Sequence, residues 1–98
     1  MLHLNYNSSS GNLVIARGAE AAGVFDATAQ HAIFGALVHG EMRVFKDTQS
    51  LFWTGQHKDG VFEMRREYPL TRFELDADER DRLGAMLRSL IFYGYPTE

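Results

Sequence analysis

Residues 76–93 read DADERDRLGAMLRSLIFY, and they give the clearest indication of fold class. Asp76 and Glu79 have the spacing of a capping box, in which each side chain accepts a hydrogen bond from the backbone N–H of the other residue. Gly94 and Pro96 are typical of the chain just after a helix end. The segment therefore predicts a C-terminal amphipathic helix with one apolar face. That face consists of Leu83, Met86, Leu87, Leu90 and Ile91.

The layer under this helix is expected to be an antiparallel sheet, because short segments of alternating apolar and polar residues precede it. Residues 2–17 are typical of a hairpin whose turn contains three serines. A meander follows after residue 41, with Asp59-Gly60 as its strongest turn signal. We therefore expect an α+β fold with one antiparallel sheet of about five strands, built from the N-terminal hairpin and the meander. The meander strands are expected at residues 42–45, 51–54 and 61–68, with a short extended segment at 71–75.

Residues 18–40 are ambiguous because alanine and glycine dominate them. One interpretation is a second helix near residues 27–39, capped by Asp26 or Thr28 and ended by Gly40. The alternative is a buried strand at residues 32–38 that turns back at His39-Gly40 into the strand at residues 42–45. A run of residues without charge, bounded by capping residues, favours the helix.

The composition is that of one domain. Ninety-eight residues, 45% of them hydrophobic and 12% aromatic, suffice for a single core. The chain has no cysteine, so it forms neither a disulfide nor a thiolate–metal site, which fits a reducing compartment. The N-terminus lacks the pattern of a signal peptide, and no segment approaches the ~20 apolar residues of a membrane-spanning helix. We expect residues 1–98 to form a single cytoplasmic domain with no membrane contact.

Charge argues against one class of partner and indicates another. The net charge is −3, whereas a general nucleic-acid binder presents a net basic surface that displaces counterions. The first forty residues carry only Arg17, Glu20 and Asp26 as charged side chains. Exposed surface normally carries charge, so this part of the chain is either unusually buried or in contact with another chain.

A helix near residues 27–39 would be apolar on two sides. Phe34 and Val38 are four residues apart and lie on the side away from Ile33 and Leu37. Exposed apolar patches commonly mark interfaces, and twofold dimers are the commonest closed assembly. We therefore expect a homodimer in which Phe34 and Val38 contact the second copy.

Residue types that carry catalysis or bind metals form no recognisable pattern in the sequence. The four histidines are too dispersed for a zinc motif, even with Asp26 or Glu41 as a further ligand. No serine stands in a Gly-x-Ser-x-Gly turn, and the glycines form no phosphate-binding loop. We predict no catalytic residue, no metal, no cofactor and a protein that is not an enzyme. The histidines are His3, His31, His39 and His57.

The expected hairpin around Phe52 and Trp53 is the best candidate for contact with another molecule. Consecutive strand residues point to opposite faces, so one of the two leaves the face that the C-terminal helix covers. Tryptophan and arginine are also enriched at binding hot spots. The alternative is that a second layer covers the other face and that the basic side chains are solvated. The predicted partner-binding residues are Phe52, Trp53, His57, Lys58, Arg65 and Arg66.

The sequence thus favours a small non-enzymatic protein that binds a larger protein as an inhibitor, adaptor or regulator, and that is itself a homodimer. The alternative is a small-ligand-binding or minor enzyme domain with a site between sheet and helix, and a nucleic-acid binder comes third. A deep pocket lined by His31, His39 and Asp26 would favour ligand chemistry. A flat, exposed aromatic patch would favour a protein partner.

Overall fold

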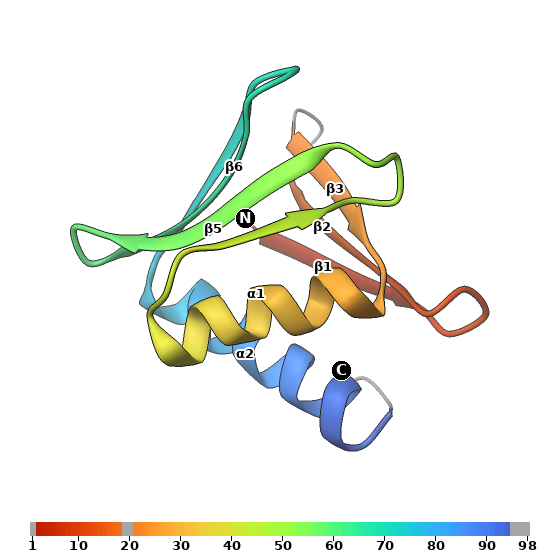
Figure 1. The fold of residues 1–98 in the computed structure, drawn as a ribbon. Coiled ribbons are helices and arrows are strands. Elements are labelled where there is room, and N and C mark those ends of the chain that lie inside the picture. Colours follow the sequence, from red (N-terminus) through yellow and green to blue (C-terminus); the bar gives the residue numbers. More distant parts are fainter. Residues whose placement is uncertain (1, 19–20, 95–98) are drawn as a thin grey trace.

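A computed structural model describes residues 2–18 and 21–94 and shows two antiparallel meanders, each followed by a helix (Figure 1). The first meander has three strands and the second has four. The fold is therefore α+β, as predicted. The elements are β1 (Leu2–Asn7), β2 (Asn12–Arg17), β3 (Ala21–Phe25), α1 (Ala27–His39), β4 (Arg43–Lys46), β5 (Phe52–Lys58), β6 (Val61–Arg66), β7 (Thr71–Leu75) and α2 (Ala77–Phe92).

The C-terminal helix α2 begins and ends where the sequence predicts. The Asp76 side chain accepts a hydrogen bond from the backbone N–H of Glu79 at 2.8 Å, and the Glu79 side chain accepts one from the backbone N–H of Asp76 at 3.2 Å. Gly94, just beyond the helix, has a φ of 75°, the left-handed conformation that suits glycine. Among the described residues, no helix is long and apolar enough to cross a membrane.

Helix α1 confirms the helical interpretation of the ambiguous segment. The Asp26 side chain accepts a hydrogen bond from the backbone N–H of Ala29 at 3.0 Å. Gly40 adopts a φ of 70° at the other end, and its N–H donates to the carbonyl of Ala36. Both caps satisfy backbone groups that have no partner inside the helix. The uncharged run is therefore a capped helix, not a buried strand.

The expectation of one five-stranded sheet was wrong, because the strands form two sheets of three and four strands. Strand β3 was missed: its sequence is AAGVF, and alanine and glycine have low strand propensity. It nevertheless pairs with β2, with Leu13 opposite Phe25. Helix α1 then carries the chain away from this sheet, and β4 starts a new one by pairing with β5 alone.

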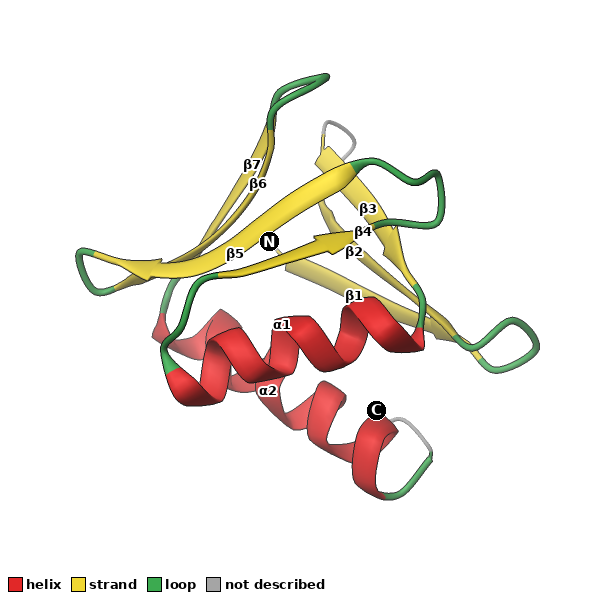
Figure 2. Ribbon diagram, in the orientation of Figure 1, coloured by secondary structure: helices red, strands yellow, loops and turns green. Residues whose placement is uncertain are grey.

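The core lies between the two sheets and the helices, which pack together on one side of both sheets (Figure 2). Phe25 of the first sheet meets Trp53 of the second edge-on, with ring centroids 5.3 Å apart. Trp53 also stacks on Phe73, at 5.9 Å. Each sheet thus contributes one apolar face to a shared interior. Fully buried members include Leu2, Leu13, Ile15, Ile33, Phe62, Met64, Leu75, Leu83 and Leu87.

Two polar contacts join the separate sheets. The backbone N–H of Thr48, after β4, donates to the carbonyl of Val24 in β3 at 2.9 Å. Arg17 of β2 donates to the carbonyl of Glu74 in β7 at 2.8 Å and pairs with Glu79 of α2 at 2.9 Å. These contacts are not part of a strand ladder, but they connect the two sheets at the edge of the aromatic core.

Candidate functional site

Strand β5 divides the predicted partner-binding residues between two faces of the four-stranded sheet. Phe52 and Lys58 are exposed on the outer face, which no helix covers. Trp53 lies on the inner face and is completely buried. His57 shares that inner face, where its ring packs edge-on against Phe62 at 5.2 Å. The alternation expected of Phe52 and Trp53 is confirmed, and the tryptophan belongs to the core.

Strand β6 divides its two arginines in the same way. Arg65 lies opposite Thr54 on the outer face, and it forms an ion pair with Glu67 at 2.9 Å. Arg66 lies opposite Trp53 on the inner face, where only 13% of its side chain is exposed. Phe52, Lys58 and Arg65 are therefore accessible to a partner on the outer face. The other three predicted residues lie on the inner face.

Asp47, which the sequence analysis did not identify, is the centre of a buried polar network. Its carboxylate accepts hydrogen bonds from the Trp53 indole N–H at 2.9 Å and from the backbone N–H groups of Gln49 and Leu51. Burial by itself would raise the pKa of Asp47. The three hydrogen bonds and the positive charge of Arg66 outweigh burial and lower this pKa below its ordinary value.

Arg66 connects this network to the turn between β6 and β7. Its guanidinium lies 5.1 Å from the Trp53 ring centroid and 3.7 Å from the Asp47 carboxylate. The same group donates from Nε to the carbonyl of Pro69 at 2.9 Å and from Nη2 to Thr71 Oγ1 at 2.7 Å. The Arg66 guanidinium therefore connects the turn directly to the core.

The β6–β7 turn projects from the molecule on the side opposite the helices (Figure 1) and carries exposed apolar side chains. Tyr68 is 86% exposed and Leu70 66%, and Phe52 at the start of β5 is 62% exposed. Tyr68 and Phe52 line a shallow hollow of about 260 Å³ together with Leu51 and Arg65. We refer to Phe52, Tyr68 and Leu70 as the turn patch.

The strand expected at residues 61–68 was predicted to include Tyr68, and this was wrong. Strand β6 ends at Arg66, so Tyr68 lies in the turn. The signal that identifies the turn residues is Pro69, which cannot donate a ladder hydrogen bond. Apolar residues on either side of such a proline leave the sheet and become exposed.

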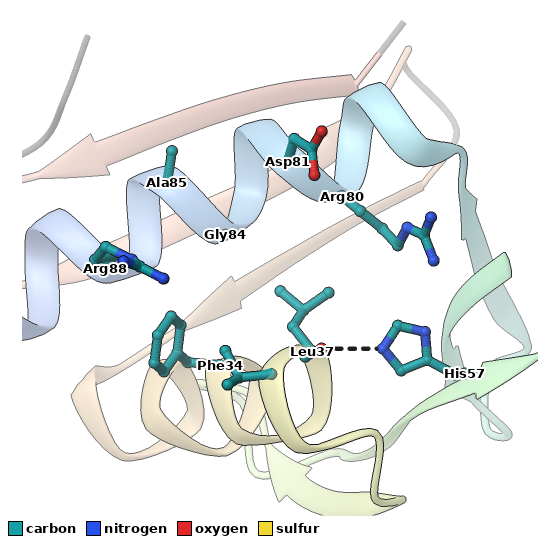
Figure 3. Close-up of a pocket in the computed structure, with 9 residues that line it drawn as sticks. Phe34, Leu37, His57, Arg80, Asp81, Gly84, Ala85 and Arg88 are labelled. Carbon is teal, nitrogen blue, oxygen red and sulfur yellow. Dashed lines mark hydrogen bonds between the residues drawn. The ribbon is translucent and has the colours of Figure 1, made fainter. Parts of the chain in front are cut away.

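A second surface is the groove between α1 and α2, which holds about 480 Å³ (Figure 3). The predicted self-association residues lie here: Val38 is 54% exposed, and Phe34 packs edge-on against Phe92 with ring centroids 5.9 Å apart. The groove lies between two helices, whereas the sequence analysis placed a ligand site between sheet and helix. Its lining is Phe34, Leu37, Val38, His57, Arg80, Asp81, Gly84, Ala85 and Arg88.

His57 closes one end of the groove by capping α1. Its Nε2 lies 3.1 Å from the carbonyl oxygen of Leu37 (Figure 3). A carbonyl only accepts hydrogen bonds, so Nε2 carries the hydrogen. Leu37 is in the last turn of α1, where carbonyls have no partner inside the helix. The contact fixes the helix end against β5 and gives His57 a structural role.

The remaining histidines do not assemble into a metal site. His31 donates from Nδ1 to the carbonyl of Ala27 at 2.8 Å, within its own helix. Neither His31, His39 nor Asp26 lines the interhelical groove. Within residues 2–18 and 21–94, no group of three or more histidine or carboxylate side chains is placed to hold a metal ion.

Two surfaces are therefore candidates for contact with another molecule. The turn patch lies on a projecting turn and the adjoining strand, and its apolar side chains lie beside one arginine. The interhelical groove is concave, and its apolar floor is flanked by charged side chains of both signs. Comparisons with protein-family models, curated proteins and solved structures find no match to this chain.

Proposed function

We propose that this protein is a small non-enzymatic protein that acts by binding a larger partner protein, as an inhibitor, adaptor or regulator, and that the turn patch is the contact surface. The observation that carries the proposal is the exposure of Tyr68, Leu70 and Phe52 on a projecting turn and the adjoining strand. Large apolar side chains exposed together commonly mark a protein interface, and tyrosine is enriched at hot spots.

Rigidity of the turn supports this function. Arg66 holds the Pro69 carbonyl and the Thr71 hydroxyl while its charge faces Asp47. A contact loop that is already ordered loses less conformational entropy when it binds. The buried network therefore favours a turn that enters a partner's cleft without refolding.

Arg65 adds a polar component at the edge of the turn patch. It lines the same hollow as Tyr68 and Phe52, and 38% of its side chain is exposed. Interfaces commonly surround an apolar centre with polar groups that fix orientation. The Arg65–Glu67 pair gives the partner one donor group and one acceptor group next to the aromatic rings.

A small-ligand-binding or minor enzyme domain is the second candidate function. The observation that favours it is the volume of the interhelical groove, about 480 Å³, which falls within the roughly 300–1,000 Å³ of ligand pockets. Its apolar floor and charged rim would suit an amphiphilic ligand.

The test of the proposed function compares two full-length baits in extract of the source cells. One bait is wild type and the other carries Tyr68→Ala and Leu70→Ser. Met42→Ala is a matched control, because Met42 is apolar and 61% exposed at the start of the second meander. A protein retained by wild type and by the control, and lost from the double variant, supports the proposal. Equal retention by all three baits contradicts it.

A further inference from the structure

The groove-facing side of α2 places Asp81 and Arg88 at equal distances from the midpoint of the helix, with a second cation, Arg80, beside Asp81. Gly84 and Ala85 are the two central residues of Ala77–Phe92. Asp81 lies three positions before Gly84, and Arg88 lies three positions after Ala85. All four line the groove, and their three- and four-residue spacings place them on one helix face. A negative and a positive charge are thus equidistant from an uncharged centre.

The charges on this face have no partner within the protein. Among the residues that the structure describes, neither Asp81 nor Arg88 takes part in an ion pair, and both are exposed. By contrast, Arg17 is paired with Glu79 and Arg72 with Glu74. Asp81 and Arg88 therefore remain free to pair with another molecule.

The centre of this face has no side chain at Gly84, and the fold does not require a glycine at this position. A Cβ atom added to Gly84 would meet no atom within 4 Å. Glycine inside a helix is less stable than alanine, so internal packing gives no reason for its presence. The absence of a side chain lets another backbone approach closely, since the distance between packed helices depends on the side chains at their contact.

From these observations we infer that the groove binds a second copy of this chain, with the two α2 helices antiparallel and crossing at Gly84 and Ala85. In a twofold dimer the same surface serves both subunits. The symmetric spacing then brings Asp81 opposite the partner subunit's Arg88, and Arg88 opposite the partner subunit's Asp81. Two Asp81–Arg88 ion pairs form for each dimer, with Arg80 of each subunit next to one of them. A parallel arrangement would place like charges together.

The apolar residues beside this face supply the buried centre of the dimer. Val38 and Phe92 are exposed on α1 and α2, and Phe34 of α1 packs edge-on against Phe92. A partner helix in the groove removes these side chains from water. This surface is separate from the turn patch, which lies on the other side of the sheets (Figure 1). Self-association and partner binding are therefore independent.

Charge-swapped variants test the dimer geometry in the full-length protein by sedimentation equilibrium between 1 and 100 µM, concentrations chosen to bracket roughly micromolar self-association. We expect wild type to dimerise, and Arg88→Asp and Asp81→Arg each to weaken the dimer at least tenfold. Mixing the two single variants restores both ion pairs in a heterodimer, and the double variant restores them in a homodimer. Lys58→Asp, on the outer sheet face, is the control and leaves the dimer unchanged.

Several results would overturn the inference. A wild-type protein that stays monomeric at 100 µM, where roughly micromolar affinity would give a dimer, excludes the second copy as occupant. Failure of the mixed variants to associate better than either alone excludes the Asp81–Arg88 pairing. Gly84→Leu should fold with an unchanged circular dichroism spectrum and lose the dimer, and a folded Gly84→Leu dimer excludes the crossing point. A small anionic amphiphile that binds the groove of a monomeric wild type, tested with dodecanoate, would also contradict it.

Discussion

The turn patch and the α2 face are both exposed, yet they differ in what supports them. Behind the turn, Arg66 is bound to Asp47, Trp53, Pro69 and Thr71. The α2 face has no comparable network. The difference shows two ways in which a fold can make a surface suited to binding. The turn is rigidified by a buried polar cluster, whereas the α2 face is made self-complementary by the spacing of its charges.

The largest expected effect is on the support behind the turn. Trp53→Ala removes a fully buried ring that contacts Phe25 and Phe73, and it leaves the Asp47 carboxylate without its indole donor. Loss of a buried aromatic side chain costs about 3–5 kcal/mol of unfolding free energy. Urea denaturation measures the loss. A cost below about 1 kcal/mol would mean that Trp53 is not the anchor of the network.

Arg65→Ala should act on partner binding rather than on folding. Arg65 lines the hollow of the turn patch and pairs only at the surface with Glu67. Exposed ion pairs contribute little stability, so the melting temperature should stay nearly unchanged. Loss of a hot-spot arginine weakens binding by at least ~2 kcal/mol, roughly thirtyfold. Thermal unfolding and partner titration of the same variant provide the check, and full retention of binding would remove Arg65 from the site.

Asp47→Asn should reveal the pH dependence of the buried network. Because the folded state lowers the pKa of Asp47, its ionised form adds stability above its unfolded pKa, and this stability is lost as the pH falls through the folded pKa. The variant should cost about 1–2 kcal/mol at pH 7. The difference from wild type should shrink as the pH falls below about 4. A difference that is constant between pH 3 and pH 7 would contradict the network.

Both helices could be predicted from the sequence because the signals that mark their ends involve residues close together in the chain. The Asp76–Glu79 box and the Asp26 cap each involve residues three apart, and Gly40 and Gly94 end their helices with positive φ. The division into two sheets could not be predicted, because it depends on β3, whose AAGVF sequence lacks the usual strand signal. Strand pairing is a long-range choice that composition does not reveal.

The candidate site was only partly predictable for a related reason. Alternation along β5 predicts that Phe52 and Trp53 separate, but the second sheet and its Phe25 decide which of the two is buried. Asp47 was overlooked because an aspartate in a turn is ordinarily a solvated residue. The groove that holds Phe34 and Val38 was not foreseen, since it requires α2 to lie alongside α1.

The smallest expected effect distinguishes the α2 face from an ordinary helix surface. Gly84→Ala should raise the unfolding free energy of the monomer, measured at concentrations too low for self-association, by about 0.5–1 kcal/mol, because alanine favours helix and nothing lies within 4 Å of its Cβ. The same change should weaken self-association. Gly35→Ala in α1 is the matched control, since its Cβ would contact only the Arg43 side chain, at 3.4 Å. If both variants affect self-association equally, the α2 crossing is incorrect.

The measurement that most directly tests the separation of the two surfaces is quantitative co-purification of the partner with Tyr68→Ala and with Arg88→Asp, side by side. Tyr68 is 86% exposed on the turn, and Arg88 is exposed in the groove on the helical side. We predict that Tyr68→Ala loses the partner while remaining dimeric, and that Arg88→Asp becomes monomeric while retaining the partner. Retention of the partner by Tyr68→Ala together with its loss from Arg88→Asp would contradict the account and assign partner binding to the groove.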